Sequence, residues 1–573
     1  MSTVSWQHGR SLRLLGVAIG ITACIIASMA TAATTHARGA RGVAPPAAPV
    51  LTNNELLAEA APDECFAGVG VDYPPMNEDG SCPEGVPKTN ESYIWGYTEE
   101  SGKLWFGTMA NTLCILSGQD TSLARQEPGL TAAANVVVCE FGDSEYARTF
   151  PEIPDTLGDW RPPRIYAYDL ATGTLAERKL EDPLIRRTLG FRGAGSIGNT
   201  VFLGGPSLLS NSVNLFAFRA DTGQFLGACE HPGYDYIREW EIVDGVLYVG
   251  AGSATHGAVL RWDGDMGSFA GNFCADFTEV GRMSADAATV TSYTGGDGRA
   301  RLAVTTVPIR SRSGTGGDGG GVGVWISPPL GAGGLTAEDA GHWRQVWSPL
   351  QYDPDRVTAQ FGYAGGAIHY FDGWLYWGTI HLQHSGALRV HQRCTQSFCF
   401  GVPETPEEEQ SLEEGVYRSA SVWRGRNLEN SSSREIQLLY GESELPACIA
   451  PKMFAMQSTG WTPLYGPSGF GTRSNEYIWQ MAVYHDRLFV GTYDAAVLQG
   501  TANVGADLWR FDDSQSPAVN ENSTGLGDRL NYGIRAMAPL DDGSGLIVGM
   551  ANPFNLATGG GWELRRLRED PPE

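Results

Sequence analysis

The sequence is poor in lysine and strongly acidic. Its 40 basic residues include only four lysines, and 65 acidic residues bring the formal net charge to −25. A surface of this sign repels phosphate backbones and anionic lipid headgroups, and no Lys/Arg cluster forms a local exception. We therefore expect no nucleic-acid partner.

Long apolar segments are also scarce, with one exception at the N-terminus. Arg10 and Arg13 precede an apolar run that ends in small residues near position 33. This order is typical of a signal peptide, so we expect residues 1–33 to be removed and the mature chain, of charge −27, to be secreted or periplasmic. A retained anchor and lipid attachment at Cys24 remain alternatives. No later segment is long and apolar enough for a transmembrane helix.

The cysteines form neither a Cys-x-x-Cys-His haem motif nor a paired Cys-x-x-Cys zinc site. Nine of the ten cysteines follow the predicted signal peptide, and export makes disulfides the default expectation. Connectivity stays open at this point, but proximity in the sequence favours four pairs: Cys65–Cys82, Cys114–Cys139, Cys229–Cys274 and Cys394–Cys399. Cys448 is then left single.

Sustained helical periodicity is absent, and one strand-rich pattern recurs instead after residue 90. An apolar strand, an Asp-Gly-type turn, a strand like Leu-Tyr-Val-Gly-Thr, a variable loop and an aromatic strand follow one another. Clear copies begin near 237, 366 and 477, and weaker ones near 93, 191, 287 and 534. Such turns suit tight hairpins. Seven copies predict an all-β fold, a seven-bladed β-propeller of four-stranded antiparallel blades.

The last copy ends near its third strand. We expect residues 63–90 to supply the missing strand and close the ring, because closure removes exposed sheet edges. Residues 34–62 are rich in Ala and Pro and predict a flexible leader, which leaves 63–573 as a single propeller domain. The blade count depends on the weak copy between Ala285 and Ile326.

Several segments resemble known propeller repeats. Residues 164–173 and 215–223 resemble quinoprotein-type (PQQ-like) repeats, and Lys103–Thr108 resembles the YVTN-type repeats of sensor propellers. The resemblance implies architecture and no particular activity. Quinoprotein dehydrogenases carry an adjacent-cysteine pair at the cofactor, which this sequence lacks, so no quinone or other cofactor is expected. The chain as a whole is similar to uncharacterised exported bacterial propeller proteins.

Long insertions mark one face of the predicted disc. In a propeller, the loop after the second strand of a blade and the loop between blades emerge on the same face. The insertions occupy residues 109–163, 327–365, 380–414 and 443–476. Loops on a rigid scaffold are where function concentrates, so we expect a ligand or partner to bind on this face.

Polar residues recur where the strands begin or end on this face. The candidate ligand-binding residues are Asn111, Arg192, Arg238, Glu239, His381, Glu476, Asp494, Arg535 and Asn552. In register they line a funnel of mixed charge, suited to a saccharide or a small anion. The alternative is that they make ordinary loop-capping hydrogen bonds.

Three histidines, His381, His384 and His391, share one insertion. They suggest either a metal site or a histidine base for sugar chemistry, whereas loop histidines in an exported protein are mostly solvent-facing. We therefore expect no metal.

The segment 193–198 matches the dinucleotide pattern Gly-x-Gly-x-x-Gly, but a strand follows it where a helix is required, so it predicts a glycine-rich hairpin.

The sequence offers two further groups of candidate residues. Acids for glycoside hydrolysis could come from Asp286, Asp353, Asp355, Glu476 and Asp494, but the sequence does not fix their separation. Trp160, with Arg161 and Arg164, lies outside the repeats at the end of the first insertion and either stacks on a sugar or supports the loop; we expect support.

The sequence favours a propeller that binds a polar small molecule, a saccharide or a protein on its loop-bearing face. One alternative is a polysaccharide lyase or glycoside hydrolase that uses His381 with Arg238 and Arg535. The other is a structural protein of the cell envelope. The sequence identifies no catalytic residues.

Overall fold

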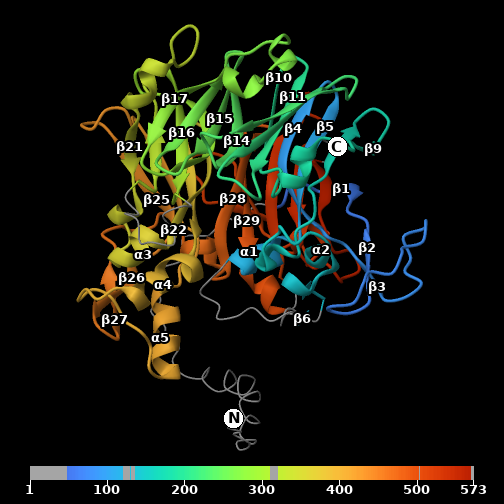
Figure 1. Ribbon diagram of the computed structural model, residues 1–573. Helices are drawn as coiled ribbons and strands as arrows, with labels where there is room; N and C mark the ends of the chain where they lie inside the picture. Colours follow the sequence, from blue (N-terminus) through green and yellow to red (C-terminus); the bar gives the residue numbers. More distant parts are fainter. Residues whose placement is uncertain (1–47, 120–128, 131–135, 310–320, 502–503, 570–573) are drawn as a thin grey trace, which may run out of the picture. The chain divides into compact units, whose positions relative to one another are not determined.

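Pairing between the named strands of the computed structural model is antiparallel. Three four-stranded meanders form separate sheets, and sixteen other strands form one larger sheet, in which further four-stranded meanders are joined by single bridges. The structure describes residues 48–119, 129–130, 136–309, 321–501 and 504–569, so the predicted signal peptide and part of the predicted leader lie outside the described residues. Strands are the predominant secondary structure, as Figure 1 shows. The all-β prediction is confirmed.

The groups follow one another along the chain. The first three are β4 (Glu91–Glu100), β5 (Lys103–Ala110), β8 (Ile165–Asp169) and β9 (Thr174–Glu177); β10 (Gly193–Ile197), β11 (Thr200–Pro206), β12 (Val213–Arg219) and β13 (Phe225–His231); and β14 (Tyr236–Val243), β15 (Val246–Gly252), β16 (Gly257–Trp262) and β17 (Phe277–Met283). The next two are β18 (Asp286–Thr294), β19 (Ala300–Val307), β20 (Val324–Ile326) and β21 (Arg344–Trp347); and β22 (Tyr363–Phe371), β23 (Trp374–His381), β24 (Val422–Arg426) and β25 (Glu435–Tyr440). Then come β28 (Asn475–Tyr484), β29 (Arg487–Asp494), β30 (Leu508–Phe511) and β31 (Val519–Asn522), and finally β32 (Gly533–Pro539), β33 (Leu546–Ala551), β34 (Glu563–Arg568) and β1 (Asn53–Glu59).

Tight turns set the register of the first hairpin in these groups. Asp244 and Gly245 join β14 to β15 with φ of 50° and 76°, and Asp372 and Gly373 join β22 to β23 with φ of 45° and 77°. Two consecutive residues with positive φ are what a type I′ hairpin turn requires, and Asp-Gly supplies them at little cost. The Asp-Gly signal in the sequence therefore located these hairpins correctly.

The first strand of each group contacts the first strand of the next. These contacts run in a closed cycle through β4, β10, β14, β18, β22, β28 and β32 and return to β4. Four-stranded meanders arranged in a ring around their innermost strands are a β-propeller. The innermost strands thus surround a common axis.

The strand that completes the last group comes from the N-terminal segment, but from a different part of it than expected. β1 pairs antiparallel with β34, with Asn53 opposite Arg568 and Glu59 opposite Glu563. Residues 53–59 lie inside the segment expected to be a flexible leader. The expected donor, 63–90, instead contains the short antiparallel pair β2 (Glu64–Phe66) and β3 (Val86–Lys88).

The insertions gather on one side of the sheets, in the lower part of Figure 1. They contain α1 (Thr112–Gln119), α2 (Glu145–Thr149), α3 (Arg356–Phe361), α4 (Arg389–Arg393) and α5 (Pro406–Val416), and the pairs β6 (Gly129–Leu130) with β7 (Val138–Cys139) and β26 (Glu444–Ala450) with β27 (Met453–Ser458). Among the described residues, no helix has the length and apolarity needed to cross a bilayer.

Four disulfides join Cys65 to Cys82, Cys114 to Cys139, Cys229 to Cys274 and Cys394 to Cys399. They are the four pairs favoured by sequence proximity, and Cys448 is free and buried. Disulfides of this number are typical of proteins outside the reducing cytosol.

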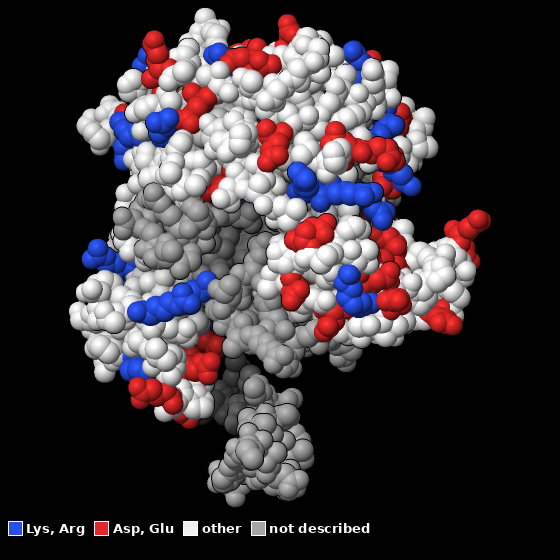
Figure 2. Space-filling model, viewed as in Figure 1, with Lys and Arg blue, Asp and Glu red and all other residues white. Residues whose placement is uncertain are grey.

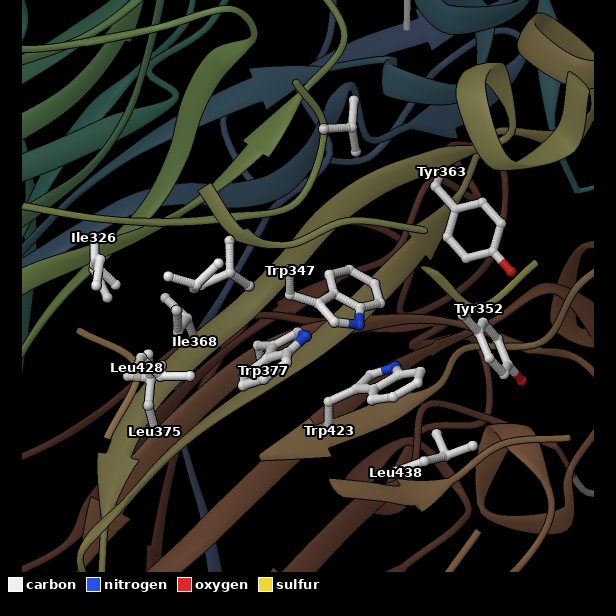
Figure 3. Close-up of a cluster of buried hydrophobic side chains, with 14 of the residues drawn as sticks. Ile326, Trp347, Tyr352, Tyr363, Ile368, Leu375, Trp377, Trp423, Leu428 and Leu438 are labelled. Carbon is white, nitrogen blue, oxygen red and sulfur yellow. The ribbon is translucent and has the colours of Figure 1, made fainter. Parts of the chain in front are cut away.

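Apolar side chains fill the space between neighbouring sheets. Figure 3 shows one such cluster, in which Trp347, Trp377 and Trp423 pack together between the sheets of β18–β21 and β22–β25. The rings of Trp377 and Trp423 are parallel within 7°, with centroids 6.5 Å apart. Trp377, which lies in the sequence copy that begins near residue 366, is therefore a core residue.

We expect Trp423→Ala to lower the free energy of unfolding by about 3–5 kcal/mol, because it leaves a large cavity in a close-packed core. Trp423 is fully buried, whereas Leu350 is 48% exposed, so Leu350→Ala is a matched control with little expected effect. Urea unfolding followed by circular dichroism measures both. Equal stability of the two variants would contradict this packing.

Candidate functional site

Three arginines from different sheets approach one another near the axis. Arg192 precedes β10, Arg238 lies in β14 and Arg535 lies in β32. The pKa of Arg535 is held well below its usual value by burial and by the positive charges of Arg238 and Arg192. Since β14 and β32 belong to sheets that are not neighbours in the ring, this proximity runs through the central space. From the sequence, we expected these three arginines to line one funnel.

A hydrogen bond also spans the ring at this level. The side-chain amide of Gln480, on β28, donates to Glu239 Oε1, on β14, over 2.9 Å, and to the backbone oxygen of Arg535 over 3.0 Å. Gln480 was not among the predicted site residues. Its position in the innermost strand, equivalent to those of the arginines, is the signal that could have identified it.

Arg238 and Arg535 are buried, and little negative charge surrounds them. Arg238 is 3% exposed and Arg535 2% exposed, and within the described residues neither has an acidic partner within ion-pair distance. Arg238 Nε has no hydrogen-bond partner. Glu239 is the carboxylate that acts on Arg535, and it already accepts the Gln480 hydrogen bond. A second acid on β14, Glu241, has its pKa raised to about 7 by burial and is therefore only partly charged at neutral pH.

Aromatic rings hold the guanidinium groups in place. The guanidinium carbon of Arg192 lies 5.1 Å from the Trp95 ring centre and 4.6 Å from that of Tyr236. That of Arg535 lies 5.5 Å from the ring centre of Trp479. Cation–π contacts of this kind orient a guanidinium while leaving its in-plane N–H groups available. A planar fork of N–H donors suits carboxylate, sulfate or phosphate oxygens.

Three other predicted site residues act as caps. Asn111 donates to the side chain of Asn90 over 2.7 Å, and Asp494 accepts from the backbone N–H of Ala496 over 2.9 Å. Asn552 donates to a backbone carbonyl seven residues further on. These contacts match the alternative, ordinary loop-capping interpretation of the polar residues at the strand ends.

His381 occupies a buried position with a structural environment. It is 2% exposed, its Nε2 lies 3.1 Å from Thr379 Oγ1, and its ring meets that of Tyr363 edge-on at 4.5 Å. Burial, with the nearby charge of Arg418, lowers its pKa to about 3. An imidazole with this pKa is a weak base, so the geometry gives little support to His381 as the base of a lyase.

The remaining histidines and acids are mostly engaged in structural pairs. His391 Nε2 lies 3.0 Å from Asp355 Oδ1, and Arg418 Nε donates to Asp353 over 2.6 Å, all four side chains being buried. The side chain of His384 lies outside the described residues. Glu476 lies near Tyr417 and helps to raise the pKa of that phenol.

The predicted glycine-rich segment 193–198 is β10 with the turn into β11, as the hairpin interpretation requires. Trp160 is 1% exposed and donates its indole N–H to the backbone oxygens of Thr188 and Leu189. It therefore supports the first insertion and is not available to stack on a ligand.

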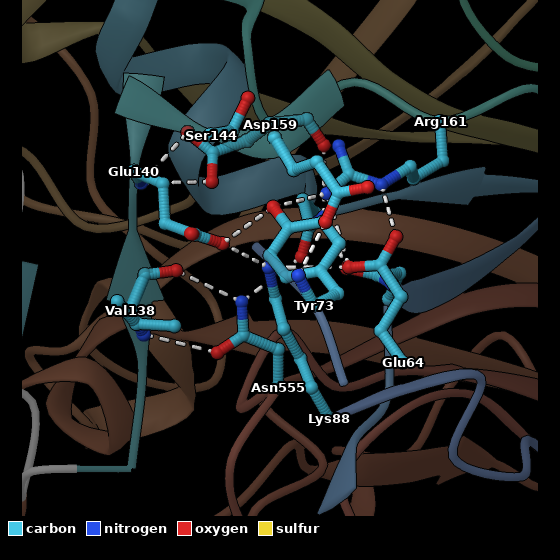
Figure 4. Close-up of polar contacts among 12 residues, drawn as sticks. Glu64, Tyr73, Lys88, Val138, Glu140, Ser144, Asp159, Arg161 and Asn555 are labelled. Carbon is cyan, nitrogen blue, oxygen red and sulfur yellow. Dashed lines mark hydrogen bonds and ion pairs between the residues drawn. The ribbon is translucent and has the colours of Figure 1, made fainter. Parts of the chain in front are cut away.

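A buried ionic network anchors the first insertion to the N-terminal segment, as Figure 4 shows. Lys88 and Glu140 are both fully buried and lie 2.7 Å apart. Arg161 pairs with Glu64, and it also donates to the hydroxyl of Tyr73, which in turn donates to Glu140.

On the molecular face shown in Figure 2, acidic and basic side chains lie side by side, and neither sign of charge dominates.

No family model matches the sequence, and no curated protein matches it. Solved structures with a similar fold include the Dos1 propeller, at 9% identity and a TM-score of 0.37 over 83% of this chain and 92% of that chain. They also include the polysaccharide lyase Uly1, at 8% identity and a TM-score of 0.39 over 90% of this chain and 99% of that chain. A putative exo-beta-1,3-galactanase from Bifidobacterium bifidum s17 matches at 10% identity and a TM-score of 0.27 over 58% of this chain and 90% of that chain. At these scores the likeness carries no conclusion about function.

The environment of His381 predicts a specific pH dependence of stability. Its pKa is about 3 in the folded chain, against an ordinary value of 6.5, so below pH 6.5 the unfolded chain binds the proton that the folded chain excludes. Stability is therefore lost progressively as the pH falls from about 6.5 towards 3. At pH 4.5 the loss from this residue is about 2–3 kcal/mol.

We expect His381→Gln to reduce the difference in unfolding free energy between pH 7 and pH 4.5, measured by urea titration at both values. His342 is exposed, so His342→Gln is the matched control and should leave the difference unchanged. A pH dependence that is identical in the two variants would show that His381 titrates normally.

Proposed function

We propose that this chain is an exported seven-bladed β-propeller that binds an anionic ligand, such as a small carboxylate or an acidic saccharide, at its axis through Arg192, Arg238 and Arg535. The signal-like N-terminus and the four disulfides support export. The closed cycle of innermost strands supports the blade number.

The anionic nature of the ligand is inferred from one observation. Arg238 and Arg535 are buried in the same axial region, and neither has an acidic partner among the described residues. Buried charges are normally paired, because an unpaired one costs several kcal/mol of desolvation. An anion in the central space would supply the missing charge and accept the N–H group that Arg238 Nε leaves unused.

The enzyme alternative finds less support in the geometry. A lyase or hydrolase needs a proton acceptor or donor beside the arginines, and His381, the candidate base, has a pKa near 3 and packs against Tyr363. A structural protein of the envelope, the other alternative, has no need of two buried arginines, Arg238 and Arg535, without acidic partners among the described residues. Binding of an anion is the function that uses them.

The test is isothermal titration of the mature chain with oligogalacturonate, citrate and sulfate, and with neutral oligogalactose as the uncharged match. We expect the acidic ligands to bind and the neutral one to fail. Arg238→Gln and Arg535→Gln should each weaken binding about tenfold to a hundredfold, the value of a charge-assisted hydrogen bond.

Arg282→Gln is the control, because Arg282 is exposed on β17 and pairs with Glu279. In an anion-free buffer, Arg238→Gln should also raise the melting temperature, since it removes an unpaired buried charge. Equal binding of acidic and neutral oligomers, or binding that survives both axial substitutions, would contradict the proposal.

A further inference from the structure

A cavity lies at the base of the first insertion, and the axial arginines do not line it. It has a volume of about 380 Å³ and is bordered by the N-terminal segment before β2, the start of β4, the segment that leads into β8, and the end of β9. All of these strand ends lie on the loop-bearing face, because β4 and β8 begin there and β9 ends there. None of the residues predicted from the sequence as ligand-binding lines this cavity.

Three carboxylates surround a single guanidinium in this cavity. Arg164 lies 2.9 Å from Asp63, 4.0 Å from Glu91 and 3.9 Å from Glu177. Asp63 is the one that Arg164 binds directly, and its other oxygen accepts two hydrogen bonds from Asn90. Glu91 and Glu177 lie too far from Arg164 for a direct hydrogen bond. Arg164 is therefore surrounded by three carboxyl groups, and the charge of this group of residues depends on whether Glu91 is ionised.

Glu91 has unused hydrogen-bonding capacity. Its side chain is 2% exposed, and neither of its carboxylate oxygens makes a well-formed hydrogen bond, although the Thr108 hydroxyl is close enough to lower its pKa slightly. A carboxylate buried without donors is costly, and structures normally satisfy one. Its position on the wall of a cavity means that a bound molecule can provide the donors.

The other basic residues on the cavity wall do not fill this need. Arg161 is committed to Glu64, and the guanidinium of Arg178 lies over the Trp105 ring at 5.5 Å. Lys179 and Arg186 are exposed, where water screens their charge. None of these four side chains hydrogen-bonds the carboxyl group of Glu91, so a bound molecule can supply donors to it.

We propose that this cavity binds a small ligand that carries a primary ammonium group, with Glu91 and Glu177 as its receiving carboxylates and Arg164 holding Asp63 beside them. An ammonium group has three N–H donors and no acceptor, which matches the two free oxygens of Glu91 and the distant Glu177. A bare metal ion fits less well, since the described residues contain no group of His, Cys, Asp or Glu arranged to hold one.

Ligand binding at this position should be coupled to a proton. Burial raises the pKa of Glu91 to about 8; Arg164 opposes the shift, and the charges of Asp63 and Glu177 add to it. Tyr166, the other titratable group that senses Glu91, stays neutral because burial raises its pKa. At neutral pH an arriving ammonium group therefore displaces the Glu91 proton, and affinity should rise with pH from 6 to 8.

The experiment is isothermal titration of the mature chain with cadaverine, and with 1,5-pentanediol as the uncharged match, at pH 6, 7 and 8. We expect cadaverine to bind with release of a proton, detected as a dependence of the heat on the ionisation enthalpy of the buffer. The diol should give no heat of binding. Glu91→Gln and Glu177→Gln should each weaken cadaverine at least tenfold, and Glu91→Gln should also abolish proton release.

Glu338→Gln is the control, because Glu338 is exposed in a turn that does not border the cavity. Arg238→Gln should leave cadaverine binding unchanged, which separates this site from the axial one. Glu177 is 28% exposed, so Glu177→Gln carries the test if Glu91→Gln does not fold. Failure of cadaverine to bind at millimolar concentration, equal binding of the diol, or no effect of Glu177→Gln would overturn the proposal.

Discussion

The pairing of β1 with β34 is the constraint on which the rest of the structure depends, because it joins the two ends of the described chain and closes the ring. Without it, the last sheet has three strands and an open edge, which is a liability for any sheet. Ion pairs reinforce the joint: Glu55 binds Arg566 over 2.7 Å and Arg568 over 3.1 Å. Glu521 of β31 adds a second tie, since it accepts from the backbone of Val50 and Leu51. The central space keeps its shape only as long as these contacts hold.

Ring closure also explains how charges become buried at the axis. The innermost strands are irregular at this level, where register shifts fall between Ile237 and Trp240 on β14, between Ile478 and Gln480 on β28, and between Ile534 and Ala536 on β32. Such bulges redirect side chains, and residues far apart in sequence come together there. Gln480 reaches Glu239 across 241 positions in this way, and Arg535 feels the charge of Arg238. Desolvation disfavours such charges, and the scaffold tolerates them because the sheets are held by their own cores. A rigid ring can thus hold a set of donors that a flexible loop would let escape to water.

Much of the fold was readable from the sequence, since turns and strand composition are local signals. The Asp-Gly turns and the disulfide pairs followed from spacing. The closing strand did not, because Asn53–Glu59 has no β-branched or aromatic residue and its burial pattern alternates poorly. His381 was misjudged for a related reason: burial depends on how an insertion folds back, and the sequence marks only its polarity. The cavity beside Glu91 was missed because its walls come from four separate segments.

A buried ionic network joins the N-terminal segment to the first insertion, close to the cavity around Arg164. Its members are Lys88, Glu140, Arg161 and Glu64. Lys88 and Glu140 are fully buried, and Arg161 and Glu64 are largely buried. Buried ion pairs contribute little net stability, but separating one pair leaves a charge without a partner. The network therefore fixes the first insertion against the N-terminal segment, and Arg161 stands only three residues before Arg164. Any movement of the insertion that opened the cavity around Arg164 would have to break the Arg161–Glu64 pair. The cavity is consequently held in shape before a ligand arrives, which lowers the entropic cost of binding there.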